Sequence, residues 1–330
     1  LCYNSNITLS DLFRCVKRGT MKKVLKIIGI AVLVLVVAGT AFLKILGNAP
    51  SPASGYWREV QAGGKIEAEY LENGPCETSY YEEKALQVFE KYEIWYPSGL
   101  EDLNKKYPVI VVNNGTGWKA SRSKHIYEHY ASWGFLVIGN EETYSWNAFG
   151  AEMALKHLER LNDNETLDNR KNIFYQKIDF DNVGIIGHSQ GGVGVFNAIT
   201  DTEHKGVYKA AIALSPTNKE LAEGLEWHYD ASKIDIPVML VSGEGGGDDW
   251  VVTLEGLAEI YHDINSQKIM LRRKNASHVV TQYSEDGYVI AWFMWHLQGD
   301  EHAAGAFAGE HAELLHNELY QDVGTNIFFE

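Results

Sequence analysis

The sequence has very little cysteine. Its 330 residues include three, and Cys76 is the only one after residue 50. A lone cysteine cannot close a disulfide within the chain, and there is no C-x-x-C pair of the kind that binds zinc. The sequence therefore excludes a disulfide-stabilised scaffold and a cysteine-based metal site in its main part.

Positive charge is also scarce once the first 50 residues are set aside. The remaining 280 residues carry 22 Lys and Arg against 43 Asp and Glu. A protein that binds nucleic acid needs a basic footprint, so this composition excludes nucleic acid as a partner. It favours a neutral or cationic small molecule over a polyanionic one as the substrate.

Long hydrophobic runs are absent except near the N-terminus, where residues 27–43 carry no charge and follow a lysine-rich flank. This pattern predicts that residues 21–47 form a signal peptide or a single membrane anchor, which would cross the bilayer through residues 24–46 if it is not cleaved. The excess of lysine before the run places the rest of the chain outside the cytoplasm. An extracytoplasmic protein without disulfides is more typical of bacteria. Residues 1–20 resemble no targeting signal and are expected to be a non-native or untranslated leader.

The remainder predicts a short linker, residues 48–60, and one catalytic domain, residues 61–330. Strands and helices alternate along this domain, which is typical of an α/β fold with a doubly wound, mostly parallel sheet. The expected strands are 65–70 and 92–96 at an antiparallel edge, then 109–113, 135–138, a strand starting at 183, 210–214, 237–241 and 268–271. The expected helices are 123–132, 148–161, 191–200, 253–263, 283–297 and 300–320.

The most informative segment is residues 183–194, where a buried strand runs through Gly187-His188-Ser189-Gln190-Gly191 into a helix. This is the context of a nucleophile elbow, a turn so tight that the positions two before and two after the serine must be small. The turn exposes the serine hydroxyl at a helix N-terminus, where the dipole favours negative charge. Ser189 is therefore the predicted nucleophile.

A serine nucleophile needs a base and a carboxylate that orients the base, in the chain order Ser, Asp or Glu, His. The acid is expected in the glycine-rich loop after strand 237–241, at Asp248 or Asp249, with Glu244 as a third choice. The apolar residues after Asp249 resemble those that fix such a loop to the edge of the sheet, which favours Asp249. Adjacent side chains point opposite ways, so only one of the two aspartates should reach the base. No Gly-Lys-Ser/Thr follows these glycines, which argues against a phosphate-binding loop.

His278 is the predicted base, because it alone of 12 histidines follows the acid in a loop between a late strand and a closing helix. His125 and His129 stand four apart on one predicted helix, a spacing that can hold a metal. No third ligand accompanies them, so a packed or solvated face is expected instead. The histidines at 302, 311 and 316 fit a polar helix face.

Acyl transfer also needs donors for the tetrahedral oxyanion. The backbone N–H of Gln190, after the nucleophile, is one, and the loop after strand 109–113 should supply the other, for which Thr116 is favoured. Trp118 in that loop and His188 beside the nucleophile are expected to line the substrate pocket, although Trp118 could equally pack inside the protein.

These segments resemble the α/β-hydrolase superfamily, and within it the branch of cutinase-like, polyester-hydrolase and dienelactone-hydrolase-like enzymes. The resemblance covers residues 65–300 and is carried by residues 107–112 with the Asn-Gly-Thr-Gly loop, residues 131–138, residues 187–192 and Ala276-Ser277-His278. It implies that Ser189, His278 and one of Asp248 and Asp249 form the triad, with Thr116 and Gln190 as oxyanion donors.

The expected function is that of a serine esterase that works through an acyl-enzyme, with no metal or cofactor. A peptidase or acyltransferase on the same fold is an alternative, because the triad chemistry is shared. A surface protein that binds ligands without turnover is a second alternative.

Overall fold

A computed structural model describes residues 23, 26–27, 29–30, 49–100 and 105–327. The chain divides into two compact units, Leu1–Ala49 and Pro50–Glu330. The leader expected at residues 1–20 and most of the signal or anchor expected at residues 21–47 lie outside the described residues. Within the described ranges, no helix has the length and apolar character needed to span a membrane.

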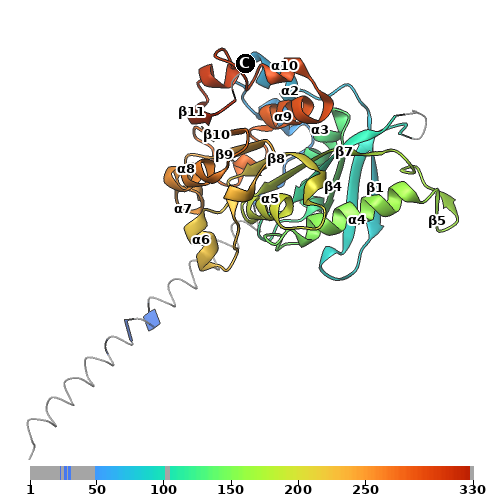
Figure 1. The fold of residues 1–330 in the computed structure, drawn as a ribbon, viewed down its shortest axis with the longest axis horizontal. Coiled ribbons are helices and arrows are strands. Elements are labelled where there is room, and N and C mark those ends of the chain that lie inside the picture. Colours follow the sequence, from blue (N-terminus) through green and yellow to red (C-terminus); the bar gives the residue numbers. More distant parts are fainter. Residues whose placement is uncertain (1–22, 24–25, 28, 31–48, 101–104, 328–330) are drawn as a thin grey trace, which may run out of the picture. The chain divides into compact units, whose positions relative to one another are not determined.

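The second unit is built around a nine-stranded sheet (Figure 1). The strand order is β1-β2-β4-β3-β7-β8-β9-β10-β11, parallel from β4 to β10 and antiparallel at both edges. This confirms the expected mixed α/β architecture with a mostly parallel sheet. The strands are β1 (Thr78–Lys84), β2 (Lys91–Pro97), β3 (Tyr107–Asn113), β4 (Leu136–Asn140), β7 (Ile178–His188), β8 (Tyr208–Leu214), β9 (Val238–Ser242), β10 (Lys268–Arg273) and β11 (Tyr320–Thr325), with a separate hairpin of β5 (Thr166–Leu167) and β6 (Arg170–Lys171).

Helices connect the strands and cover both faces of the sheet. The α-helices are α2 (Lys65–Leu71), α3 (Lys124–Ser132), α4 (Phe149–Asp163), α5 (Gln190–Thr200), α6 (Lys219–Gly224), α7 (Asp248–Val251), α8 (Leu254–Asp263), α9 (Asp286–Gln298) and α10 (Glu301–Ala304). Short 3-10 turns are η1 (Tyr56–Glu59), η2 (Gln87–Phe89), η3 (Ala120–Arg122), η4 (Lys205–Val207), η5 (Ala231–Lys233), η6 (Val280–Gln282) and η7 (Glu313–His316).

The core has two halves, one on each side of the sheet, because successive strand residues point to opposite faces. On β3, Ile110 packs with residues of α2, α3 and α9, while Val109 and Val111 pack with residues of α4, α5 and α8. Burial of a sheet on both faces explains the uninterrupted apolar runs of its central strands. The frame fixes the carboxyl ends of β7, β9 and β10, from which the predicted catalytic side chains project.

The prediction of a strand at residues 65–70 was wrong, because this segment is helix α2. Its apolar residues alternate, but the face that it buries contains Glu67, Tyr70 and Leu71, at helical spacing. Glu67 accepts hydrogen bonds from Tyr320 and Arg273, and Glu313 accepts from the first backbone N–H groups of the helix. All three partners lie more than 200 residues away, so the local pattern could not reveal them.

The prediction of one helix over residues 300–320 was also wrong. The segment contains only α10 and η7, and the chain then enters β11, which pairs antiparallel with β10. Gly309 adopts a positive φ of 86°, a conformation that ends helical structure. His302, His311 and His316 therefore do not share one helix face.

Part of the predicted linker, from Pro50 to Val60, belongs to the compact unit. Tyr56 and Trp57 are buried in the core. The Tyr56 hydroxyl donates a hydrogen bond to Asp286 at the start of α9, and the Trp57 ring stacks on His129 of α3 with centroids 4.9 Å apart. This N-terminal segment thus ties two helices together on one side of the sheet.

Candidate active site

Ser189 occupies the sharp turn between β7 and α5. Its backbone angles are φ 57° and ψ −121°, a conformation that L-residues rarely adopt and that costs on the order of 1–3 kcal/mol. Its N–H donates to the carbonyl oxygen of Leu214 on the neighbouring strand β8, at 2.8 Å. The surrounding sheet therefore holds the serine in a strained position at the N-terminus of a helix.

The two glycines around Ser189 are required by close backbone contacts. A Cβ at Gly187 would lie 2.3 Å from the carbonyl oxygen of Gly191, and one at Gly191 would lie 2.4 Å from that of Asn113. Real Cβ atoms do not approach backbone oxygens so closely. The G-x-S-x-G spacing thus follows from the packing of α5 against the ends of β7 and β3.

The structure brings His278 and Asp248 together. Nδ1 of His278 lies 2.5 Å from Oδ1 of Asp248, and both side chains are fully buried. His278 stands in the loop after β10, and Asp248 begins α7 after β9. The two loops are bound to each other, because Gly245 forms a β-bridge with Ser277 and the His278 N–H donates to Gly246.

The carboxylate of Asp248 is held in its charged form. Its Oδ2 accepts hydrogen bonds from the Ser215 hydroxyl and from the Gly243 N–H, each at 2.6 Å. Burial alone would raise the pKa of Asp248, but the hydrogen bond and charge of His278, with these two donors, hold that pKa below its ordinary value. A charged carboxylate on Nδ1 keeps the Nδ1 proton in place, which leaves Nε2 of His278 as the basic nitrogen.

The other two acid candidates lie elsewhere. Asp249 is exposed, and its carboxylate accepts from the N–H of Gly247 in its own turn at 3.1 Å. Glu244 is exposed and accepts from the N–H of Asn275 at 3.0 Å. The structure therefore pairs Asp248 with the predicted base. The apolar residues that follow Asp249 had favoured Asp249 instead.

His188, predicted to line the substrate pocket, lies beneath the loop of His278. Its Nε2 is 2.6 Å from the carbonyl oxygen of His278, and the two rings are 4.5 Å apart. Burial and the neighbouring His278 lower the pKa of His188 to about 3. The ring is neutral near pH 7, so its Nε2–H donates to the carbonyl, and the role of His188 in a substrate pocket stays a prediction.

The loop after β3 lies next to the nucleophile. A Cβ at Gly115 would be 3.2 Å from the carbonyl oxygen of His188 and 3.6 Å from the Cβ of Ser189, so this glycine lies close against the elbow. The N–H groups of Gly117 and Trp118 donate to the carbonyl oxygens of Thr143 and Gly115, so they are not aimed at the serine. Thr116 keeps its place as the predicted second oxyanion donor, beside Gln190 at the start of α5.

Trp118 is buried and packed. Its Nε1 donates to the Ser123 hydroxyl at 2.8 Å, and the Arg122 guanidinium covers its ring at 3.6 Å. These contacts fit the packing alternative of the sequence analysis, and the role of Trp118 in a substrate pocket stays a prediction.

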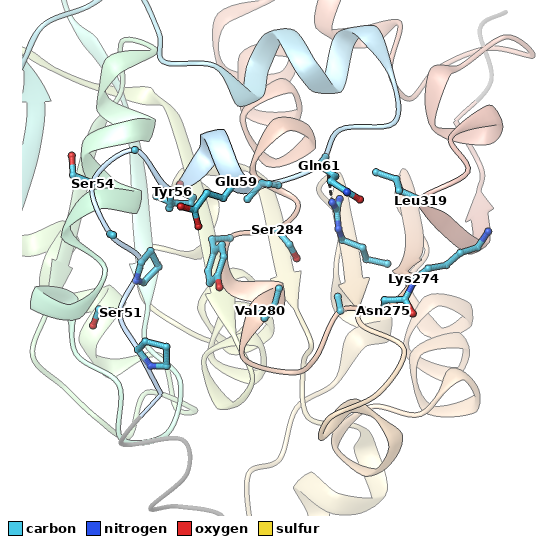
Figure 2. Close-up of a pocket in the computed structure, with 18 of the residues that line it drawn as sticks. Ser51, Ser54, Tyr56, Glu59, Gln61, Lys274, Asn275, Val280, Ser284 and Leu319 are labelled. Atoms are coloured by element: carbon cyan, nitrogen blue, oxygen red, sulfur yellow. Dashed lines mark hydrogen bonds between the residues drawn. The ribbon is translucent and has the colours of Figure 1, made fainter.

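A cavity of about 640 Å³ lies beside the histidine loop (Figure 2). It is bordered on one side by the N-terminal segment, including Ser51 and Tyr56, and on the other by Asn275 and Val280. None of the predicted triad residues is among the described residues that line it. The cavity therefore borders the chain on both sides of His278, at Ala276 and Val280.

Two residues of the site were not expected from the sequence, Ser215 and Thr281. Ser215 follows β8 directly, and side chains at the carboxyl ends of parallel strands gather at one edge of the sheet. That position was a usable signal for Ser215. Thr281 sits in η6, three residues after His278, where nothing in the local sequence marks it.

Metal binding has weak support among the described residues. His129 is packed against Trp57, and His125 contacts Glu128 on its own helix. One cluster, Glu152, Glu203 and His204, has ligand atoms close enough for an ion. The ammonium group of Lys156 lies 3.2 Å from Glu152 and 2.8 Å from Glu203, so a positive charge already sits between these carboxylates.

Comparison with models of protein families identifies a family for this chain. A family model described as PET hydrolase-like matches residues 65–321. The comparison with curated proteins finds no match. The matched range begins at α2 and ends within β11, so it includes the strands from β1 to β10, the start of β11 and every residue of the candidate site.

Proposed function

The chain belongs to the PET hydrolase-like family of α/β-hydrolase polyester hydrolases, and on that premise we propose that it is a serine hydrolase that cleaves carboxylic esters through an acyl-enzyme. Family membership implies a hydrolase that acts on esters. The identity of the nucleophile, base and carboxylate and the two-step route are the further content of the proposal.

In the first step, Nε2 of His278 takes the proton of the Ser189 hydroxyl as its oxygen attacks the ester carbonyl carbon. The carbonyl oxygen becomes an oxyanion, which the backbone N–H groups of Gln190 and Thr116 stabilise. When the oxyanion collapses, the bond to the alcohol breaks and His278 gives the same proton to the leaving oxygen. Asp248 keeps the Nδ1 proton in place and stabilises the transient imidazolium.

In the second step, water replaces the alcohol. His278 takes one proton of the water, the hydroxide attacks the acyl carbon, and the proton returns to Ser189 as the acid leaves. No redox change and no co-reactant other than water are needed. The observation that carries the proposal is the buried contact of 2.5 Å between His278 and Asp248, on loops that follow β10 and β9, together with the strained turn at Ser189.

A fluorophosphonate probe tests the nucleophile, because it phosphonylates only an activated serine. We expect the unmodified chain to be labelled at Ser189 and to hydrolyse short p-nitrophenyl esters. Ser189→Ala should lose both properties. Ser79→Ala, on the edge strand β1, is the matched control and should keep both.

Labelling that persists in Ser189→Ala would refute the assignment of the nucleophile. A clear preference for aminoacyl anilides over esters would instead favour the peptidase alternative. Tight binding of esters without any turnover would favour the ligand-binding alternative.

A further inference from the structure

We propose that Ser215, Thr281 and His188 are positioning residues that hold Asp248 and the backbone of His278 in place. The inference rests on the proposed function, since it assigns a role to groups that act through its base and carboxylate. It concerns a closed circuit of contacts at hydrogen-bonding distance that the sequence did not suggest.

The circuit starts and ends at His278. From the Asp248 carboxylate, Oδ2 contacts the Ser215 hydroxyl at 2.6 Å, and Ser215 contacts the Thr281 hydroxyl at 2.7 Å. The Thr281 hydroxyl lies 2.8 Å from the backbone carbonyl oxygen of His278. The imidazole of the same histidine closes the circuit by its contact of 2.5 Å with Asp248. Asp248 thus contacts the His278 ring directly and is linked to the His278 backbone through Ser215 and Thr281.

All four side chains of the circuit are buried, with Ser215, Asp248, His278 and Thr281 each 0% exposed. Water cannot replace a partner that is lost there, and a buried polar group without a partner is costly. Buried networks of this kind stabilise one arrangement of their members when every member is satisfied. The surroundings therefore select a single rotamer of Asp248.

Counting protons explains the part played by His188. Ser215 and Thr281 bring one hydroxyl proton each, whereas three contacts link Asp248, Ser215, Thr281 and the His278 carbonyl. The Ser215 proton goes to Asp248, so the Thr281 proton lies within reach of both the His278 carbonyl oxygen and the Ser215 oxygen and can serve only one of them at a time. The Nε2–H of neutral His188, 2.6 Å away, gives that carbonyl a donor in either case.

Two consequences follow from this arrangement. Because His188 also donates to the His278 carbonyl, that oxygen keeps a partner even when the Thr281 proton points to Ser215. Asp248 itself receives three donors, Ser215, the Gly243 N–H and His278. The charge that stabilises the imidazolium is therefore fixed before the ester binds, which is the preorganisation that catalysis requires.

The test compares Thr281→Val, which keeps the shape of the side chain and removes the hydroxyl, with Thr281→Ser, which keeps the hydroxyl. We expect Thr281→Val to lower kcat about tenfold, equivalent to about 1.4 kcal/mol, with KM changed less than about twofold. Thr281→Ser should recover most of the lost kcat. The rate of fluorophosphonate labelling should follow kcat, because it depends on the same activated serine.

A double-variant cycle separates positioning from general loss of packing. In an Asp248→Asn background, Thr281→Val should change the labelling rate less than about twofold, because its effect passes through the carboxylate. Ser215→Ala, measured in the same way, provides a second variant should Thr281→Val fold poorly. Thermal unfolding of each protein verifies that it is folded at the assay temperature.

The inference is overturned if both Thr281→Val and Ser215→Ala keep normal kcat in an active enzyme, or if either lowers the rate equally with and without Asp248. Failure of the unmodified chain to hydrolyse esters or to be labelled is a different result. It would refute the proposed function itself.

Discussion

Replacing Asp248 with asparagine should impose the wrong tautomer on the base. Asparagine has one carbonyl oxygen and one NH2 group where aspartate has two equivalent oxygens. The Gly243 N–H can only donate, so the carbonyl oxygen takes the place of Oδ2, 2.6 Å from that nitrogen. The NH2 group then faces Nδ1 of His278, which can accept its hydrogen bond only without a proton. The ring proton moves to Nε2, where it prevents the ring from accepting the Ser189 proton.

The size of the effect follows from this change of tautomer. Loss of an orienting carboxylate with the geometry intact lowers kcat by about 10³ to 10⁴, equivalent to about 4 to 5.5 kcal/mol of activation free energy. KM should change little, because Asp248 is fully buried and does not touch the substrate. Folding should survive, since the two side chains have nearly the same size.

Asp249→Asn is the matched control. Asp249 is the neighbouring residue, it is exposed, and its hydrogen bond to Gly247 can be kept by an amide oxygen. We expect this variant to lower kcat less than about tenfold. Initial rates on a short p-nitrophenyl ester over a range of concentrations give kcat and KM for both variants. The reasoning fails if Asp249→Asn shows the larger loss, or if neither variant loses more than about tenfold, in which case Glu244 is the next residue to change.

Two further predictions concern stability. Gly187→Ala places a Cβ 2.3 Å from a carbonyl oxygen and should destabilise the fold by about 1–3 kcal/mol, which a lower Tm would show. Gly206→Ala, with open space around it, is the control and should keep the Tm of the unmodified chain. Equal Tm values for the two variants would contradict the close contact at Gly187. Burial raises the pKa of Asp286 from 3.8 to about 7, so the folded state keeps a proton that the unfolded state loses. The free energy of unfolding should therefore fall by up to about 1.4 kcal/mol per pH unit between about pH 4 and 7. Urea titrations at several pH values should show that Asp286→Asn loses this part of the pH dependence of the free energy of unfolding.

The parts of this protein that are set by nearby residues could be predicted from the sequence. Apolar runs placed the central strands correctly, because those strands are buried on both faces. The elbow was recognisable because the strand, the glycines and the helix that create its close contacts are adjacent in the chain. The order of the three candidate loops follows from a parallel sheet whose strand ends meet at one edge.

The wrong prediction at residues 65–70 and the open choice between Asp248 and Asp249 have a common physical cause. Helix α2 was mistaken for a strand because its buried carboxylate, Glu67, is stabilised by Arg273 and Tyr320 from the other end of the chain. The choice between Asp248 and Asp249 depended on which of the first two side chains of the four-residue helix α7 points toward His278. Contacts of this kind join residues far apart in the chain, and no single segment carries information about both partners.

The buried Tyr56 and Trp57 have a consequence for where the folded unit begins. The family match starts at residue 65, yet the core already includes these two aromatic rings. A chain shortened to the matched range would strip the stacking partner from His129 and remove one of the two tyrosine hydroxyls that donate to Asp286. The boundary of sequence similarity and the boundary of cooperative folding are thus different positions in this protein, and proteolytic trimming between them would open the hydrophobic interior rather than remove a spacer.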